Sequence, residues 1–132
     1  MSIDIQQELI SHAQRELPNE CCGYITGQGS ALMQVYPMTN VDASPVHFSF
    51  EPTEQFKVIK DARTRQEVPV AVYHSHPESP ARLSNEDLRL LNDPNMVYII
   101  VSLEQHTPEL KAYHVINGNI TDVDIVYREG KK

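Results

Sequence analysis

One segment limits the choice of fold more than any other part of this sequence. Residues 68–73 form a nearly continuous apolar run that is bounded by polar residues. Such a run predicts a strand that is buried on both faces of a sheet. The run leads directly into His74, Ser75 and His76. These polar side chains are therefore expected at the point where a core strand emerges.

Helices are expected on either side of this strand. Apolar residues at four-residue spacing predict an amphipathic helix over residues 3–17, which Pro18 ends. A second helix is expected from Pro52 to about Gln66, because proline is well placed in a first helical turn. Ser84 opens a short third helix, which stops before the next proline.

Further strands complete the expected sheet. In addition to the buried run they are predicted at 21–26, 31–37, 46–50, 96–103 and on both sides of the Asn117 and Gly118 pair. The first two are separated by a turn composition and should form a hairpin, and Asn-Gly is a strong signal for a two-residue hairpin turn. Three helices with roughly seven strands indicate an α/β fold.

The chain length favours one domain. At 132 residues a domain buries roughly two-thirds of the surface that its unfolded chain exposes, so one core is sufficient. We therefore expect a single domain over residues 1–132, with residues 128–132 frayed. The sequence contains no internal repeat, linker or low-complexity segment.

Charge and hydropathy exclude several partners. The formal charge of −7 opposes binding to phosphate backbones, which requires clustered Lys and Arg, so no nucleic-acid partner is expected. The longest apolar run, 96–101, is far shorter than the ~20 residues of a membrane helix, and residues 1–7 do not show a basic stretch followed by an apolar core. We expect no membrane association and a cytoplasmic location. The sequence does not indicate an oligomeric state.

The two cysteines do not explain any metal chemistry. Cys21 and Cys22 are adjacent, which is neither a disulfide framework nor the spacing of a structural zinc site. We expect both to be small buried side chains on a strand. Metal binding must therefore use histidines and carboxylates.

His74 and His76 are the first candidates for metal ligands. Alternate side chains of a strand point to the same face, so both imidazoles could reach one ion at ~2.0 to 2.1 Å. Asp87 is our choice for the third ligand, with Glu78 and Glu86 as competing carboxylates. Three protein ligands with one open position are typical of catalytic zinc. The remaining histidines are expected at surface or satisfied core positions: His12, His47, His106 and His114.

Ser84 and Asp87 also have a purely structural interpretation. Ser-x-x-Asp before an apolar stretch is the signature of a capped helix start. Both interpretations can hold together, because such a helix would place Asp87 in its first turn and near the ion. The Ser84 hydroxyl would then lie close to the open coordination position.

The complete pattern is His-x-His, seven residues, Ser, two residues, Asp, with an upstream Glu. It resembles the motif of the JAMM (MPN+) zinc metalloproteases, and the resemblance to small prokaryotic members extends along nearly the whole chain. Glu20 matches the upstream Glu of this motif. Without the motif, its place after a helix would be typical of an ordinary solvated carboxylate. The resemblance implies one MPN domain, whose mixed central sheet is flanked by about three helices. It also implies one Zn²⁺ per chain on His74, His76 and Asp87, with Glu20 as general base and Ser84 stabilising the oxyanion.

A substrate class also follows from the resemblance. It implies a metallopeptidase or isopeptidase that cuts after the C-terminal Gly-Gly tail of a ubiquitin-like or sulfur-carrier protein. The short chain has no room for large insertions, so recognition should use a compact groove near the metal, with Arg82 as a candidate anchor. An extended tail can add to a sheet edge, and glycine allows close backbone approach. Precursor trimming, release of cysteine or homocysteine, and deconjugation from lysine all stay open.

The sequence argues against three other functions. Inactive MPN scaffolds lack the ligand set that this chain retains. Relatives of the RadC type, associated with DNA repair, usually continue the His-x-His with Pro-Ser-Gly, whereas this chain has Pro77, Glu78 and Ser79. Zinc deaminases carry His-x-Glu and a later Pro-Cys-x-x-Cys, and neither occurs here. The pattern of many relatives differs at three positions, which here are Val72, Tyr73 and Leu83. These differences remove no catalytic group, but they concern the shape of the substrate groove.

Overall fold

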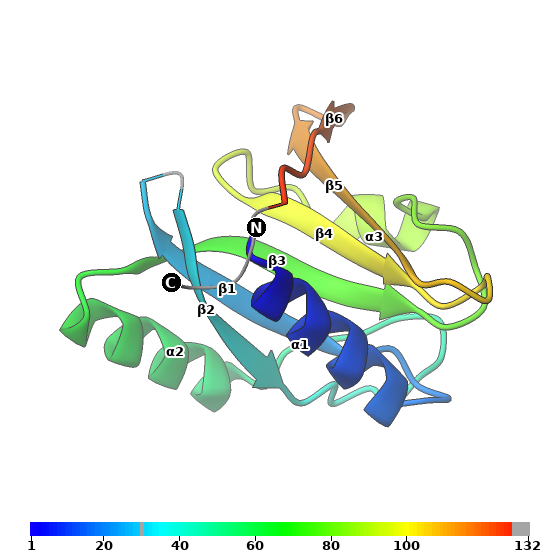
Figure 1. Cartoon of the computed structure of the whole chain (residues 1–132), viewed down its shortest axis with the longest axis horizontal. Helices are drawn as coiled ribbons and strands as arrows, with labels where there is room; N and C mark the ends of the chain where they lie inside the picture. The colour runs from blue at the N-terminus through cyan, green and yellow to red at the C-terminus, as the bar shows by residue number, and fades with distance from the viewer. Residues whose placement is uncertain (30, 128–132) are drawn as a thin grey trace.

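The computed structural model describes residues 1–29 and 31–127 of the chain (Figure 1). The elements are α1 (Ile3–Arg15), β1 (Cys22–Gln28), β2 (Ala31–Met38), α2 (Pro52–Thr64), β3 (Val68–His76), α3 (Asn85–Leu90), β4 (Val97–Ser102), β5 (Glu109–Ile116) and β6 (Asn119–Val123). This arrangement confirms the predicted α/β fold with three helices. The frayed end predicted for 128–132 lies outside the described residues.

The described strands form one mixed sheet of six strands in the order β2-β1-β3-β4-β5-β6. β3 and β4 are parallel, and every other neighbouring pair is antiparallel. Both predicted hairpins, β1–β2 and β5–β6, are present. In the second, Asn117 and Gly118 have φ values of 53° and 80°, which suits the type I′ turn that Asn-Gly favours.

The strand predicted for residues 46–50 is wrong. The alternation that suggested it has another cause, because Phe48 and Phe50 turn towards the core and pack there with ring centroids 5.5 Å apart. The backbone of this segment bonds within its own loop instead of joining the sheet. The Ser49 N–H donates to the Asn40 side chain, and the Ser49 carbonyl accepts from the Val41 N–H. The sheet consequently has one strand fewer than expected.

β3 separates two apolar layers, as its buried pattern predicts. Ala71 and Tyr73 face the cluster that includes α1, whereas Val72 belongs to the cluster on the opposite face. Figure 1 shows α1 in front of the sheet and α3 behind it. Because side chains alternate along a strand, His74 and His76 share the face of Val72. The polar end of β3 therefore points to the side of the sheet where α3 lies.

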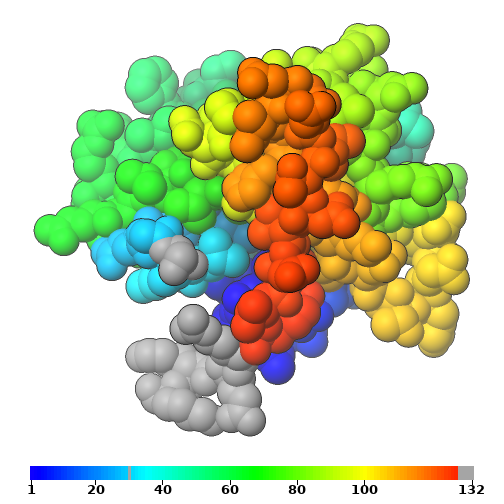
Figure 2. Space-filling view, turned by 90° about the horizontal axis from the view of Figure 1, so that it is seen from above, coloured from blue at the N-terminus to red at the C-terminus, as the bar shows by residue number. Residues whose placement is uncertain are grey.

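Element ends differ from the predictions by a few residues. α1 ends at Arg15 and α2 at Thr64, each two residues early, and Gln66 after α2 has a positive φ of 59°. β3 continues through His76. After β6 the chain returns to the N-terminus (Figure 2), where the Met1 amino group donates to the Val126 carbonyl at 2.7 Å. Within the described residues, no helix is long and apolar enough to cross a membrane.

Candidate metal centre

The end of β3 and the first turn of α3 bring three potential ligands together. The Nε2 atoms of His74 and His76 are 3.2 Å apart, and they lie 3.2 and 3.1 Å from Asp87 Oδ2. All three residues are buried. Two ligands bound at ~2.0 to 2.1 Å to one tetrahedral ion are themselves roughly 3.3 Å apart. The spacing of the three atoms therefore fits one small cation.

The choice among the carboxylates follows from the start of α3. Asp87 lies in the three-residue group, whereas Glu78 and Glu86 do not. The Ser84 Oγ accepts from the Asp87 N–H, and the Ser84 N–H donates to Asp87 Oδ2, both at 3.0 Å. This is the predicted capping box. The cap fixes the Asp87 carboxylate beside the histidines and leaves the hydrogen of the exposed Ser84 hydroxyl available to a ligand.

Each histidine ring is held in a different way. His76 Nδ1 lies 2.8 Å from the Pro80 carbonyl, so its N–H is placed on Nδ1 and Nε2 keeps a free lone pair. The His74 ring stacks against Phe48 with centroids 4.8 Å apart, and its buried Nδ1 has no hydrogen-bond partner. Both arrangements direct an Nε2 atom towards Asp87.

The loop that carries the Pro80 carbonyl is itself tied to the sheet. Tyr113 Oη donates to the Ala81 carbonyl at 2.6 Å, and Ser102 Oγ donates to the Ser79 carbonyl at 2.7 Å. Ser102 lies on β4, which neighbours β3 in the sheet, and Tyr113 lies on β5, the next strand after β4. The orientation of His76 therefore depends on β4 and β5 as well as on β3.

Glu20 is a buried carboxylate and not the solvated one that its position after a helix suggests. Its side chain is 3% exposed, and the buried Oε1 has no hydrogen-bond partner. Burial raises the pKa of Glu20 to about 8; the charge of His76 partly opposes this increase, and the charge of Asp87 adds to it. A buried carboxylate with one unpartnered oxygen, whose ionisation is affected by the charges of His76 and Asp87, is a candidate proton acceptor.

The charges of the cluster are strongly coupled. Burial opposes ionisation of Asp87, but hydrogen bonds with His74 and His76 hold the pKa of this carboxyl below its ordinary range. Burial lowers the pKa of His74. For His76 the effect of burial is outweighed by bonds with Asp87 and Pro80, which raise its pKa. One anionic carboxylate between two imidazoles is a donor set that suits a divalent cation.

The backbone around Glu20 is bonded to β3, the strand that carries His74 and His76. The Cys21 N–H donates to Ser75 Oγ at 2.7 Å, and the Ser75 N–H donates to the Cys21 carbonyl at 3.1 Å. This contribution of Ser75 is not predicted from the sequence, although its place between the histidines could have indicated it. The stacking of Phe48 on His74 had no signal in the sequence, because it depends on a loop conformation.

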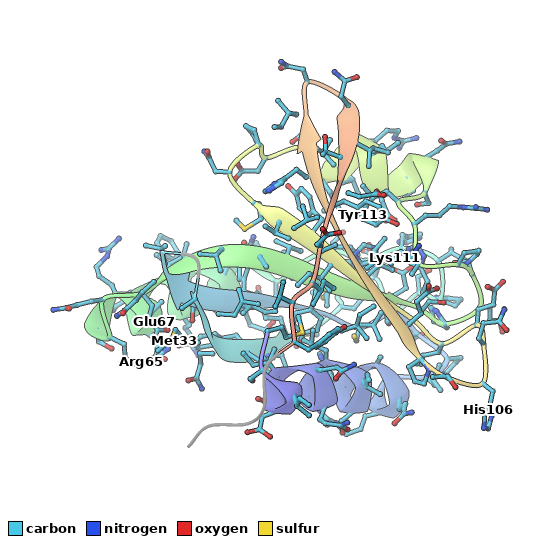
Figure 3. All side chains as sticks on the ribbon, turned by 45° about the horizontal axis from the view of Figure 1, so that its top comes forward. Met33, Arg65, Glu67, His106, Lys111 and Tyr113 are labelled. Atoms are coloured by element: carbon cyan, nitrogen blue, oxygen red, sulfur yellow. The ribbon has the colours of Figure 1, made fainter. Side chains whose placement is uncertain are left out.

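The cysteines and the remaining histidines lie outside the cluster. Both cysteines are buried and free, as expected, and burial raises the pKa of Cys21 to about 12. His12 is buried and pairs with the Tyr73 hydroxyl at 2.8 Å, whereas His47 pairs with Asp42 and His106 is exposed on the loop between β4 and β5 (Figure 3). His114 departs from the expectation, because its buried Nδ1 has no partner.

Sequence comparisons identify close relatives of the chain. A CysO-cysteine peptidase of Mycobacterium tuberculosis is 35% identical over 122 residues, which cover 90% of this chain and 84% of the relative. A desampylase of Haloferax volcanii is 30% identical over 109 residues, covering 77% of this chain and 78% of the relative. These identities extend well beyond the segment from His74 to Asp87.

Structural and family comparisons agree with this result. The solution structure of protein DSY2949 from Desulfitobacterium hafniense superposes with a TM-score of 0.89 and 36% identity, covering 98% of this chain and 94% of that one. The family model for prokaryotic homologs of the JAB domain matches residues 2–115. The match covers most of the chain and confirms the family predicted from the motif. The chain belongs to the prokaryotic JAB family.

Proposed function

We propose that this protein is a zinc-dependent metallopeptidase or isopeptidase. It hydrolyses the bond that follows the C-terminal Gly-Gly tail of a ubiquitin-like or sulfur-carrier protein. The observation that carries the proposal is the set of three ligand atoms 3.1 to 3.2 Å apart, next to a buried carboxylate with an unpartnered oxygen. A structural zinc site would instead be closed by four ligands, mostly thiolates.

Zinc is the metal that we assign to this site. Two imidazole nitrogens and one carboxylate oxygen match the ligand sets of catalytic zinc. His74, His76 and Asp87 would hold the ion. A zinc ion there supplies a Lewis acid that polarises the scissile carbonyl and acidifies water.

Glu20 is the proposed general base. Its carboxylate accepts the proton of the attacking water and passes it to the leaving amine. A pKa of about 8 lies close to neutral pH, where a group can both take and return a proton, and a nearby cation would lower it. We assign the oxyanion donor role to the Ser84 hydroxyl, because the bond from the Asp87 N–H uses its oxygen and not its hydrogen.

The substrate class is inferred from the relatives and from the size of the chain. Their printed names are CysO-cysteine peptidase and desampylase, and we transfer to this chain the cleavage of a small carrier or modifier at its tail. Glycine in that tail lets the backbone approach the buried cluster without a side-chain clash. The cytoplasmic location and the role of Arg82 as an anchor stay predictions.

Mass spectrometry tests this function directly. The enzyme is incubated with a carrier protein extended after Gly-Gly by one amino acid, and with one joined there to a lysine. We expect cleavage after Gly-Gly of at least one substrate, cleavage at least ~100-fold slower by Glu20→Gln, and much slower cleavage when Gly-Gly is replaced by Ala-Ala. Cleavage of unrelated peptides with neither carrier cut would refute the substrate class. Zinc binding without any hydrolysis would favour a scaffold function.

A further inference from the structure

Asn40 uses its whole hydrogen-bonding capacity on backbone groups. Its Nδ2 donates to the carbonyls of Glu20 and His47 at 3.0 and 3.1 Å. Its Oδ1 accepts from the N–H groups of Asp42 and Ser49 at 3.0 and 3.3 Å. Two carbonyls on one side and two N–H groups on the other allow only one orientation of the amide.

These four bonds connect the proposed general base to a loop. Residues 41–49, which we call the Asn40 loop, have no regular structure. The Glu20 N–H donates to the carbonyl of Ser44 in this loop at 2.8 Å. The loop therefore contacts Glu20 at its N–H, and Asn40 contacts Glu20 at its carbonyl. The backbone of Glu20 is held on both sides.

The Asn40 loop also reaches the candidate metal centre. Phe48 from this loop stacks on the ring of His74 with centroids 4.8 Å apart. Inside the loop, Asp42 accepts hydrogen bonds from the Ser49 hydroxyl at 2.8 Å and pairs with His47 at 3.1 Å. A single amide thus sets the position of a segment that contacts both the backbone N–H of Glu20 and a candidate metal ligand.

The carboxylate of Glu20 lacks the support that its backbone has. Its buried Oε1 has no hydrogen-bond partner, so the direction of the side chain depends on the backbone and on packing. A misplacement of about 1 Å in a catalytic group can cost ~10²-fold in rate. Restraint of the Glu20 backbone therefore has a direct consequence for proton transfer.

We propose that Asn40 is a positioning residue, which fixes Glu20 for proton transfer by bonding its carbonyl and by closing the Asn40 loop over its N–H. The inference rests on the proposed hydrolytic function. It assigns no contact between Asn40 and the substrate, so Asn40 should affect turnover more than substrate binding.

The main test is a double-mutant cycle between Asn40 and Glu20, with cleavage after Gly-Gly as the assay. Asn40→Asp keeps the shape of the side chain and removes both donated bonds. Asn119→Asp, at an exposed position on β6, makes the same charge change and is the matched control. We expect Asn40→Asp to lower kcat by ~10 to 100-fold, with unchanged zinc content and KM within about threefold. Asn119→Asp should leave all three values unchanged.

The cycle separates positioning of Glu20 from other effects. In a Glu20→Gln background, Asn40→Asp should lower kcat by less than about threefold, because the effects of residues that act as a unit are not additive. A further loss as large as in the wild-type background would overturn the proposal. So would a loss confined to KM or explained by lost zinc.

A second measurement needs no substrate, so it still decides the question if the proposed function fails. The Glu20 amide bonds Ser44 and not Asn40, so its hydrogen exchange reports how the loop holds Glu20. We expect exchange at this amide to be at least ~10-fold faster in Asn40→Asp than in Asn119→Asp, because opening of the loop exposes the amide. Equal exchange in the two variants would overturn the proposal. Asn40→Ala, which removes all four bonds without adding charge, is the alternative variant if Asn40→Asp does not fold.

Discussion

Replacing Glu20 by Gln should stabilise the protein at alkaline pH and leave its stability almost unchanged in acid. Burial raises the pKa of Glu20 from 4.5 to about 8, whereas the unfolded chain keeps the ordinary value. Between these two pH values the folded protein binds a proton that the unfolded protein does not. Wild-type stability therefore falls as the pH rises through this window, and the full cost of ionised Glu20 is present above it.

The size of the effect follows from the same two values. At ~1.4 kcal/mol per pKa unit, ionised Glu20 costs at most roughly 5 kcal/mol at pH 9. Water entry and rearrangement reduce this cost, so Glu20→Gln should gain about 2 to 5 kcal/mol there. At pH 4.5 the ionisation contributes less than ~0.5 kcal/mol to the difference between the two proteins.

Urea unfolding of both proteins at the two pH values is the appropriate assay. A chelator is included, because a bound cation would stabilise the Glu20 carboxylate and hide the effect. The loss of the Glu20 shape or packing would contribute equally at both pH values, so the difference between them isolates the charge. A stability difference that is the same at pH 4.5 and pH 9 would refute the burial argument.

Three further variants test the site. His76→Ala should remove most of the zinc found by elemental analysis after dialysis, whereas His106→Ala on an exposed loop should retain it; equal zinc in both would exclude His76 as a ligand. Ser84→Ala should lower kcat by ~10²-fold and cost ~1 kcal/mol of stability. Ser2→Ala, which removes the cap of α1, should cost similar stability without changing kcat, and a matching loss of kcat would contradict the role of Ser84. Ser75→Ala leaves the Cys21 N–H unpaired and should cost ~1 to 3 kcal/mol in urea unfolding, with Ser75→Thr close to wild type; no cost would mean that this bond is not needed.

The sequence predicts the fold well where pattern and burial coincide. The apolar run predicts a buried strand, which is β3, and the Asn-Gly pair predicts a hairpin turn, which joins β5 and β6. Residues 46–50 show the limit of this reasoning. Alternating apolar residues indicate which side chains are buried, but they do not indicate whether the backbone bonds a strand or a side chain such as Asn40. That choice depends on residues that meet only in the folded chain.

The candidate ligands could be chosen from spacing because both local structures are short and regular. Two positions along β3 bring His74 and His76 to one face, and the capping box places Asp87 in the first turn of α3. The environment of Glu20 could not be inferred in this way. The Glu20 backbone bonds Asn40 and Ser44, and its neighbour Cys21 bonds Ser75, and these partners are distant from Glu20 in the sequence.

The most direct test of the proposed mechanism is a zinc titration of chelator-treated enzyme during cleavage of a carrier protein after its Gly-Gly tail. We predict no cleavage without metal and a linear return of activity that saturates at one zinc per chain, because one set of three ligands forms one site. The Glu20→Gln variant should bind the same amount of zinc and stay at least ~100-fold slower than the wild type. Full activity without metal, or activity in Glu20→Gln equal to wild type, would contradict the assignment of His74, His76, Asp87 and Glu20.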